Sequence, residues 1–319
     1  MIRHRYYYVF TLFLLLSSQF GCKSSTAPES GTNGASGTIT FGDPFDVDMT
    51  TLGSNTSKVL FAGFDPAWTP SGQIIYAVTR GTSSDGNNQI LVSNSDGTNT
   101  SFLLNFQEWL TTVDEHPHMS PDGKYISFNY FSEGGTFSPY YGTWIYTRSG
   151  TPVIRVDSMW DASWAPDGSF VVAGTVNANG FFTSDVTLYA PGLYRVDNQF
   201  KTITPIGSGL TRPKLPSVSP NGKTVAFEMN SHIWTINMDG TGLKQVTSGA
   251  NEETYSAWSP DGNSIAVESL GTIGFTSGTR LAIVSANSNT ALSDAYTGWV
   301  KDNSAQLGYL NPTRSISWR

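Results

Sequence analysis

Apolar and polar residues alternate in short runs along most of the chain, and turn-forming residues separate the runs. One example is the run SIAVES at 264–269, which follows a Pro-Asp-Gly turn. Alternation with a period of two places apolar side chains on one face of a β-strand, whereas an amphipathic helix repeats every three to four residues. The pattern therefore predicts many short strands connected by turns.

The strongest feature of this pattern is a repeat with five copies. Each copy has a large apolar residue two positions before a proline, then a tight turn of the Pro-Asp-Gly type and an alternating strand. Proline fixes φ and glycine adopts positive φ at such turns, so each copy predicts a pair of strands. The prolines are 51, 45, 54 and 40 residues apart, which suits propeller blades. They are Pro70, Pro121, Pro166, Pro220 and Pro260.

Further strands complete each unit of the repeat. A third strand rich in aromatic and aliphatic residues follows, such as HIWTIN at 232–237. In several copies a second polar turn leads to a fourth strand, such as LKQVT at 243–247. Four antiparallel strands per repeat are the unit of a propeller blade.

The two ends of the repeat region complement each other. The final strand, 314–318, matches the first strand of a sixth unit, and three candidate strands within 38–62 precede the first complete copy. Pairing these segments would close the ring and protect its sheet edges. We therefore predict an all-β fold, a six-bladed β-propeller of four-stranded antiparallel blades closed by strand 314–318 joining strands 38–62. A degenerate seventh blade within 270–313 is the alternative.

The first 22 residues have the pattern of a secretion signal that ends at a cysteine. Basic residues precede an apolar stretch at 6–16, which is too short to span a bilayer comfortably. Cys22 is the only cysteine and resembles the lipidated cysteine of a bacterial lipoprotein; an ordinary signal is the alternative. We expect a signal peptide at 1–21, a lipidated cysteine and flexible tether at 22–37, and one propeller domain at 38–319.

Charge and composition limit the classes of partner that the chain can bind. The net charge is −7, and it becomes −9 when Arg3 and Arg5 leave with the signal peptide. An acidic chain without basic clusters matches nucleic acid poorly. Lys23 favours the outer membrane, by analogy with enterobacterial sorting, and does not indicate which side the domain faces. We expect a monomeric domain held in the bacterial cell envelope by its lipid anchor alone.

The repeat, together with segments such as DGTGLKQVT at 239–247, resembles the TolB-type WD40-like propeller repeat over about residues 38–319. The resemblance implies the fold and leaves function open, because that family includes scaffold proteins, propellers attached to peptidases and some sugar lyases. The sequence has no Gly-x-Ser-x-Gly elbow, phosphate loop or paired-histidine zinc helix. A hydrolase would therefore have to work at the mouth of the propeller channel.

The links between blades are long and aromatic on one face of the predicted ring. The longest is 293–313, on the face opposite the Pro-Asp-Gly turns. Long loops on a rigid scaffold are common binding sites, but such aromatics can also pack their own loops. The aromatics in question are Tyr140, Tyr141, Trp160, Phe181, Phe182, Tyr189, Tyr296 and Trp299.

The predicted innermost strands point to a second candidate site. The residue three positions before the repeat proline is small in every unit except one, where it is His118. His116 lies two positions earlier on the same side of the strand, with Asp65 and Asp161 at the same place in the flanking units. These four residue types suit a divalent metal, and the His-x-His segment weakly resembles that of the oligogalacturonate lyases. The alternative is that they hydrogen-bond the backbone of the next blade.

Two classes of function follow. The first is a scaffold that binds an envelope protein or glycan through its loop-rich face, with no cofactor. The second is an enzyme, a polysaccharide lyase or hydrolase, in which a divalent metal acts at the channel mouth and Arg314 or Lys214 neutralises a uronate. A purely structural role cannot be separated from the first by sequence. The candidate binding residues are Asp65, Asp114, Glu115, His116, His118, Trp160, Asp161, Lys214, Glu253, Tyr255, Trp299 and Arg314.

Overall fold

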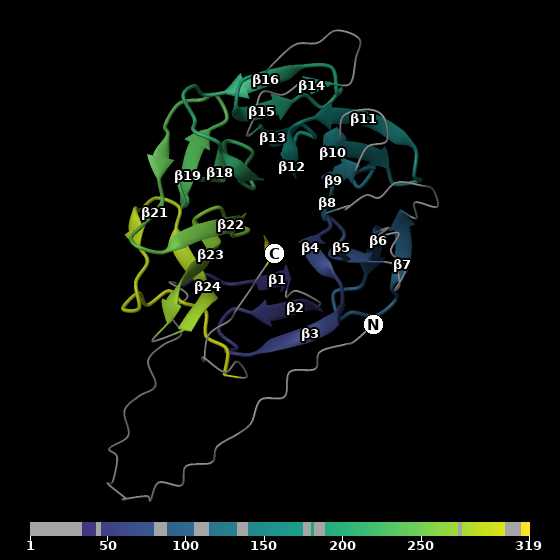
Figure 1. Cartoon of the computed structure of the whole chain (residues 1–319). Helices are drawn as coiled ribbons and strands as arrows, with labels where there is room; N and C mark the ends of the chain where they lie inside the picture. Colours follow the sequence, from purple (N-terminus) through teal and green to yellow (C-terminus); the bar gives the residue numbers. More distant parts are fainter. Residues whose placement is uncertain are drawn as a thin grey trace, which may run out of the picture.

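The fold is a ring of β-sheets around a central axis (Figure 1). The computed structural model describes residues 34–42, 46–79, 88–104, 115–132, 140–174, 180–181, 189–273, 276–303 and 314–319. These residues form 26 strands, and none of them lies in a helix. In the described part of the chain, no helix is long and apolar enough to cross a membrane. The predicted signal peptide, Cys22 and most of the tether fall outside the described residues.

Six antiparallel sheets form the blades, and each runs outward from an innermost strand that follows the repeat pattern. Blade 1 is β4 (Phe64–Trp68), β5 (Ile74–Thr79), β6 (Asn88–Ser93) and β7 (Ser101–Leu104). Blade 2 is β8 (Glu115–Met119), β9 (Tyr125–Ser132), β10 (Tyr140–Thr147) and β11 (Pro152–Asp157), with β14 (Gly180–Phe181) on its outer edge. Blade 3 is β12 (Trp160–Trp164), β13 (Phe170–Gly174), β15 (Gly192–Val196) and β16 (Ile203–Ile206).

The remaining blades continue around the ring. Blade 4 is β17 (Lys214–Val218), β18 (Thr224–Met229), β19 (His232–Asn237) and β20 (Lys244–Gln245). Blade 5 is β22 (Glu252–Trp258), β23 (Ser264–Ile273) and β24 (Thr276–Ser285). Blade 6 is β26 (Arg314–Trp318), β1 (Thr38–Gly42), β2 (Asp46–Thr51) and β3 (Ser57–Ala62). A short parallel pair, β21 (Thr247–Ser248) and β25 (Thr290–Ala291), links blades 4 and 5 at the rim.

The predicted closure of the ring is confirmed. Strand β26 pairs with β1 in antiparallel register, from Ile39 opposite Trp318 to Gly42 opposite Arg314. The N–H of Thr38 also donates to the carbonyl of Arg319 at 2.7 Å. Residues more than 270 positions apart in sequence therefore share one sheet, as the sequence predicts.

The described residues of 270–303 complete blade 5 and form no seventh blade. The bridge between Ala282 and Trp299 and the hydrogen bonds of Ile283 N to Gly298 O and Val300 N to Leu281 O make a short fourth strand. The seventh-blade alternative is therefore wrong for this part of the chain. The ring therefore has six blades, as the repeat predicts.

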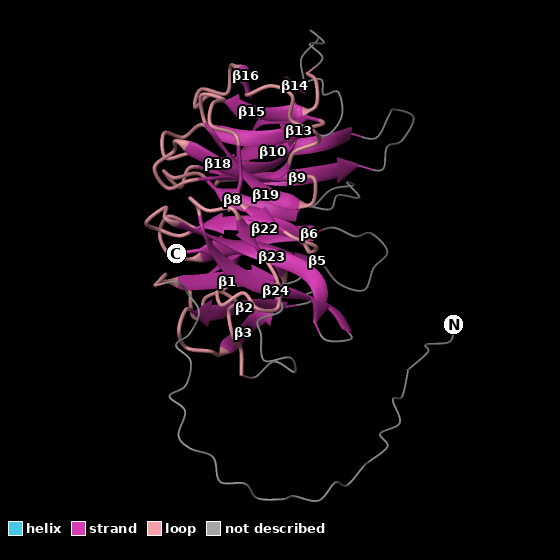
Figure 2. Cartoon of the chain, turned by 90° about the vertical axis from the view of Figure 1, so that its left-hand side faces the viewer, coloured by secondary structure: helices cyan, strands magenta, loops and turns pink. Residues whose placement is uncertain are grey.

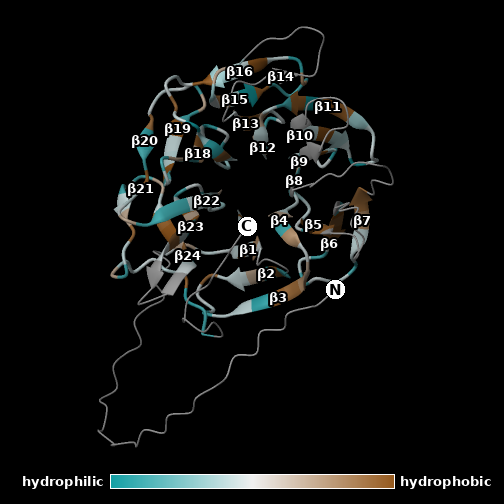
Figure 3. Ribbon diagram, in the orientation of Figure 1, coloured by the Kyte–Doolittle hydropathy of each residue, from teal (hydrophilic) through white to brown (hydrophobic). Residues whose placement is uncertain are grey.

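The core is divided among the junctions between blades. Six clusters of buried apolar residues each lie between two neighbouring blades, and hydrophobic residues are spread around the whole ring (Figure 3). Large side chains on the second strands, such as Phe128 and Phe227, are at most 1% exposed. Burial of each such ring contributes about 2–3 kcal/mol, so every junction adds to the stability of the ring.

Seen edge-on, the ring is a disc with strands running across its thickness (Figure 2). In blades 1 to 5 the innermost strand runs toward the turn that begins at the repeat proline, and β26 takes the place of the innermost strand in blade 6. The disc therefore has a turn side, where the repeat prolines lie, and a link side, where the innermost strands begin. The channel between these two faces holds the candidate site.

Candidate functional site

A shared backbone distortion marks the link side of the channel. In blades 1 to 5 the residue five positions before the repeat proline has positive φ, and the strand register shifts beside it. Positive φ in a residue other than glycine costs on the order of 1–3 kcal/mol, and a bulge of this kind turns a side chain in a new direction. The five residues are Asp65 (51°), His116 (55°), Asp161 (61°), Leu215 (49°) and Tyr255 (38°). The sixth, Ser315, is not among the residues with positive φ.

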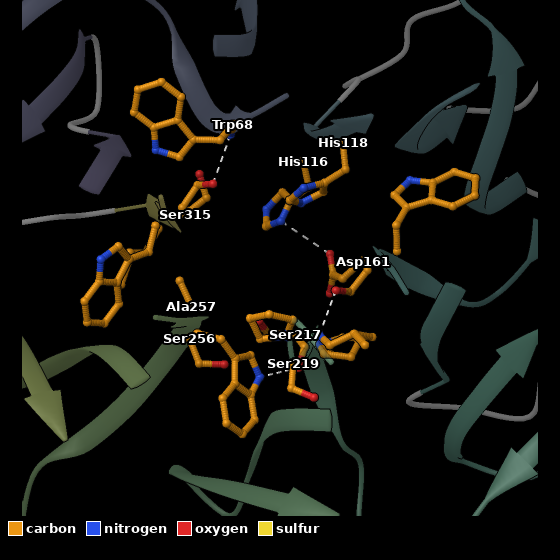
Figure 4. Close-up of a pocket in the computed structure, with 18 of the residues that line it drawn as sticks. Trp68, His116, His118, Asp161, Ser217, Ser219, Ser256, Ala257 and Ser315 are labelled. Carbon is orange, nitrogen blue, oxygen red and sulfur yellow. Dashed lines mark hydrogen bonds and ion pairs between the residues drawn. The ribbon is translucent and has the colours of Figure 1, made fainter. Parts of the chain in front are cut away.

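A central cavity of about 420 Å³ opens on the turn side of the ring. All six innermost strands contribute to its wall, as Figure 4 shows from within. Its rim is apolar and rigid, because it consists of repeat prolines and of the large residues that precede them. The rim residues are Trp68, Pro70, Met119, Pro121, Trp164, Pro166, Val218, Pro220, Trp258 and Trp318.

His116 closes the inner end of this cavity together with residues from three other blades. Its Nε2 lies 3.8 Å from Asp65 Oδ2, and its Nδ1 lies 3.5 Å from Asp161 Oδ1. Its ring stacks on Tyr255 of blade 5, on the opposite side of the axis, with 5.7 Å between centroids. A second pocket of about 430 Å³ lies beyond, on the link side, and it shares His116, Asp161, Leu215 and Tyr255 with the cavity. These four side chains form a partition across the channel.

His118 lies on the cavity side of this partition, on the same strand as His116 (Figure 4). Burial in the channel lowers the pKa of His118 from 6.5 to about 4, with a further contribution from His116, and Asp161 opposes the shift. The imidazole is therefore neutral near pH 7 and presents one hydrogen-bond donor and one acceptor.

Small polar residues on the innermost strands accept hydrogen bonds from the next blade. Ser163 Oγ accepts the N–H of Val218 in the next blade at 2.9 Å, and Ser317 Oγ accepts that of Trp68 at 3.0 Å. Asp65 acts in the same way, because its Oδ2 accepts the N–H of His116 at 3.2 Å. The alternative that the sequence leaves open, hydrogen bonding to the next blade, therefore describes Asp65.

A metal site gains no support from these contacts. No group of three or more His, Cys, Asp or Glu side chains is placed to hold a metal ion within the part of the chain that the structure describes. His116 already lies between two carboxylates, and Asp65 is 2% exposed beneath it.

Two predicted binding residues are buried in packing roles. Glu253 is 1% exposed; its Oε2 lies 2.6 Å from His232 Nδ1, and its Oε1 accepts from Ser269 Oγ at 3.3 Å. Trp299 is 2% exposed and lies under the Arg280 guanidinium, 3.9 Å from the ring centroid. Tyr296 packs edge-on against it. These contacts favour the packing alternative for this segment, since it supplies the fourth strand of blade 5.

The other predicted residues divide between the link-side pocket and parts that are not described. Trp160 and Lys214 line the link-side pocket, where Lys214 Nζ lies 3.0 Å from Glu228 Oε1. Tyr189 packs edge-on against Tyr194. Asp114 and the side chains of Glu115, Tyr140, Tyr141, Phe181, Phe182 and Arg314 lie outside the described residues.

One strand position that the sequence analysis missed carries polar residues in three blades. Asn129, Glu228 and Glu268 occupy the same place on the second strands of blades 2, 4 and 5. Asn129 Nδ2 donates to Asp161 Oδ1 at 2.6 Å, and Asn129 Oδ1 accepts the Asp161 N–H at 2.9 Å. Aligning the second strands would have revealed this position, since a polar residue there interrupts an otherwise buried strand.

Glu268 differs from Asn129, because one oxygen of its side chain has no hydrogen-bond partner. It is 3% exposed, and its Oε2 has no hydrogen-bond partner. Burial raises the pKa of Glu268 from 4.5 to about 8. The neighbouring Ala266, on the same face of β23, packs with Ile316 and Trp318 of blade 6, so Glu268 belongs to the blade 5–blade 6 junction.

Comparison with known proteins agrees with the fold. TolB of Acinetobacter baumannii superposes with a TM-score of 0.58 at 14% identity, over 88% of this chain and 66% of that one. A putative TolB of Agrobacterium tumefaciens gives 0.52 at 16%, over 89% and 98%. Hydrazine synthase of Kuenenia stuttgartiensis gives 0.58 at 11%, over 91% and 48%. No protein-family model and no curated protein matches the sequence. The ring is thus a TolB-like six-bladed propeller, and its chain spans just under two thirds of the first of these structures.

Proposed function

We propose that this chain is a protein-binding scaffold that holds a segment of its partner in the turn-side mouth of the central cavity. The observation that carries the proposal is the cavity itself, about 420 Å³, with a wall from six strands and a rim that includes four repeat prolines and four tryptophans. Tryptophan is enriched among the residues that dominate binding energy, and a rigid rim loses little entropy on binding. The likeness to TolB structures supports this class of function through the fold.

The turn side replaces the link side as the favoured binding face. The sequence favours the link side because its loops are long and aromatic, but Trp299 and Tyr296 from the longest link pack against blade 5. The link-side pocket is separated from the cavity by the His116 and Tyr255 rings. A partner segment therefore has its deepest binding site among the Pro-Asp-Gly turns.

A cavity-filling substitution tests the proposal. Ser217 lines the cavity, and Ser217→Phe would fill it without removing the backbone carbonyl that Trp258 Nε1 uses. A photo-crosslinking residue at exposed Ser71, on the turn side, should capture an envelope protein in cells, and one at exposed Glu252, on the link side, should not. Ser217→Phe should abolish capture while the melting temperature stays unchanged. Equal capture by the filled variant would overturn the proposal.

The lyase alternative has no supporting observation in the described residues. Among them, no lysine or arginine lines the wall of the central cavity, and Arg319 lies outside it against the Trp68 ring. Lys214 lies in the link-side pocket and is paired with Glu228. We therefore propose no enzymatic activity.

We also propose that the propeller is anchored to the outer membrane of a bacterial envelope through Cys22. The signal-like segment at 1–21, the cysteine and the Ser/Gly-rich tether support the anchor, and the TolB-like fold supports only the envelope location. Labelling with a radioactive or alkyne fatty acid should mark the wild-type protein and not Cys22→Ser. Labelling of both, or of neither, would contradict a lipid anchor at this residue.

A further inference from the structure

The chain enters the ring on the turn side of the disc. The N–H of Thr38 donates to the carbonyl of Arg319 at 2.7 Å, and the N–H of Arg319 donates to the carbonyl of Thr38 at 2.9 Å. Figure 2 shows the C-terminus at one face of the disc. The Arg319 guanidinium lies 5.8 Å from the Trp68 ring centroid, and a Cβ on Gly72 would clash with it. Gly72 is in the turn after Pro70, so the first strand starts beside the turn of blade 1.

The residues just before this strand are held at the same place. The Trp318 indole N–H donates to the carbonyl of Ser36 at 3.1 Å, and Ala35 packs against the cluster that includes Trp318. Gly37 has a φ of 122°, and a Cβ there would clash with the Arg319 carbonyl, so this position requires glycine. Trp318 also belongs to the cavity rim. The entry point of the chain therefore adjoins the turn-side mouth.

The segment between Cys22 and this entry point is short. It consists of residues 23–33, and the described part of the chain starts at Gly34. A chain of this length reaches about 40 Å when it is fully extended. A Ser/Gly-rich chain of the same length spans about 20 Å on average. With Cys22 in the membrane, as proposed above, the entry point cannot lie further from the membrane surface than the extended length.

The same length favours one face of the disc over the other. A path from the entry point to the link side first crosses blade 6 from β1 to β3, which takes about 10 Å. It then follows the six residues of β3 across the disc, which takes about 20 Å more, and it must also pass the side chains at both corners of the rim. Such a path needs most of the extended length of the segment. The turn side therefore faces the membrane.

The space beneath the mouth limits the kind of partner. A folded domain of about 100 residues has a radius of gyration of about 13 Å, so it is roughly 30 Å across. This diameter exceeds the average span of the segment that separates the mouth from the membrane. A partner segment that rises from the membrane surface fits this space without stretching the segment.

We propose that the turn-side mouth faces the membrane that holds Cys22, and that its partner is a protein attached to the same membrane. The partner presents its binding segment within about 40 Å of the membrane surface, because the mouth cannot move further away. Attachment of both proteins to one surface also raises their effective concentration. This inference rests on the proposed function, including the lipid anchor, and it specifies where the partner segment is presented.

Energy transfer to the lipid surface tests the orientation. The sample is the full-length lipidated protein in vesicles of phosphatidylethanolamine and phosphatidylglycerol whose headgroups carry an acceptor dye. Cys22 is the only cysteine, so Ser71→Cys on the turn side and Glu252→Cys on the link side, both exposed, can each carry one donor dye. Transfer from position 71 should be at least about twice as efficient, because the segment keeps this side near the lipid. Equal transfer, stronger transfer from position 252, or no transfer from either would overturn the inference.

The protein without an added cysteine is the control for this labelling. It should take up no dye, because a lipidated cysteine has no free thiol. Dye uptake at Cys22 would overturn both the anchor and the orientation that depends on it.

A change in the length of the segment tests whether the partner shares the membrane. Insertion of about 36 Gly/Ser residues after Ser30 makes the segment about four times longer and should lower photo-crosslinking from position 71 about eightfold, because effective concentration falls with the −3/2 power of length. Shuffling residues 24–33 without changing their number is the matched control and should leave capture unchanged. The captured protein should stay with the membranes through an alkaline wash.

Three results of this experiment would overturn the inference. They are capture that does not respond to the insertion, capture of a protein that the alkaline wash releases, and crosslinking to lipid alone. The first two would indicate a soluble partner, and the third would indicate that the mouth contacts the bilayer itself.

The outcomes also separate this inference from the function on which it rests. If Ser217→Phe abolishes capture but positions 71 and 252 transfer energy equally, the scaffold function stands and the orientation falls. If energy transfer is as expected but capture survives in Ser217→Phe, the turn side faces the membrane and the proposed function falls. That second result would also overturn the claim that a membrane-attached partner enters the mouth.

Discussion

Two junctions on opposite sides of the ring solve the same problem differently. Between blades 2 and 3, Asn129 and Asp161 exchange two hydrogen bonds, and Trp164 Nε1 donates to Ser127 Oγ at 2.9 Å. Between blades 5 and 6, the equivalent positions are Glu268 and Ser315, and both have an atom without a partner. The backbone differs as well, since Asp161 has positive φ and Ser315 does not.

The comparison shows that a repeat fold does not require identical junctions. Apolar packing at the blade 5–blade 6 junction is as complete as elsewhere, with Ile39, Ala266 and Ile283 fully buried. Packing of this kind is enough to hold two blades together, because several buried side chains contribute about 2 kcal/mol each. The inner polar positions are therefore free to differ from blade to blade.

We expect the largest loss of stability from removal of β26. This strand belongs to two junctions, blade 5–blade 6 and blade 6–blade 1. Deleting residues 314–319 removes β26, its pairing with β1 and the bond from Trp68 N to Ser317 Oγ. We expect the melting temperature to fall by more than about 10 °C. Leu243→Ala, at an exposed rim residue, is the control. An unchanged melting temperature in the deletion would show that β26 does not close the ring.

A pair of single substitutions tests the contrast directly. Asn129→Ala leaves the Asp161 N–H and carboxylate without their partner, and we expect it to lower the free energy of unfolding by about 2–3 kcal/mol. Ser315→Ala removes a hydroxyl that bonds to nothing, so its effect should stay within about 0.5 kcal/mol. Urea denaturation of both variants measures the difference. Similar losses in the two variants would mean that Ser315 has a partner in solution.

Glu268 makes the stability of the blade 5–blade 6 junction depend on pH. Its folded pKa, about 8, lies above the ordinary value of 4.5, so the folded state keeps a proton that the unfolded chain releases between these values. This stabilisation is fully present below pH 4.5 and is lost as pH rises through 8. Glu268→Gln should therefore unfold like the wild type at pH 4 and be about 2 kcal/mol more stable at pH 9. A destabilised variant at pH 9 would instead reveal a cationic partner for the carboxylate.

His118 should give a smaller effect of opposite sign at low pH. Its folded pKa, about 4, lies below the ordinary 6.5, so the unfolded chain binds more protons in this window. Stability is retained above pH 6.5 and lost as pH falls through 4. His118→Gln should flatten this part of the pH profile by about 1–2 kcal/mol, which thermal unfolding between pH 4 and 7 can measure. An unchanged profile would mean that the pKa of His118 is not lowered in the folded protein, because water or a carboxylate contacts its ring.

Local patterns in the sequence predict the fold well and the site only in part. The turn and the alternating strand after each repeat proline are short-range features, so five units and the closing strand can be found without a structure. The same alignment places His116 and His118 on the channel. It could not show that Trp299 and Glu253 are buried, because their burial depends on how a long link returns to blade 5 and on His232 from another blade.

The sequence by itself determined the number of blades and the place of each innermost strand, since a period-two pattern and a Pro-Asp-Gly turn constrain the backbone locally. Only the tertiary structure decided which side chains divide the channel into two pockets. The rings of His116 and Tyr255 stack although the two residues lie in blades 2 and 5, far apart in the sequence. The stack forms because the bulges at both residues turn their rings toward the axis. Likewise, Glu268 Oε2 and Ser315 Oγ lack hydrogen-bond partners because each blade meets a different neighbour. Those pairings follow from closing the ring, and no single repeat contains them.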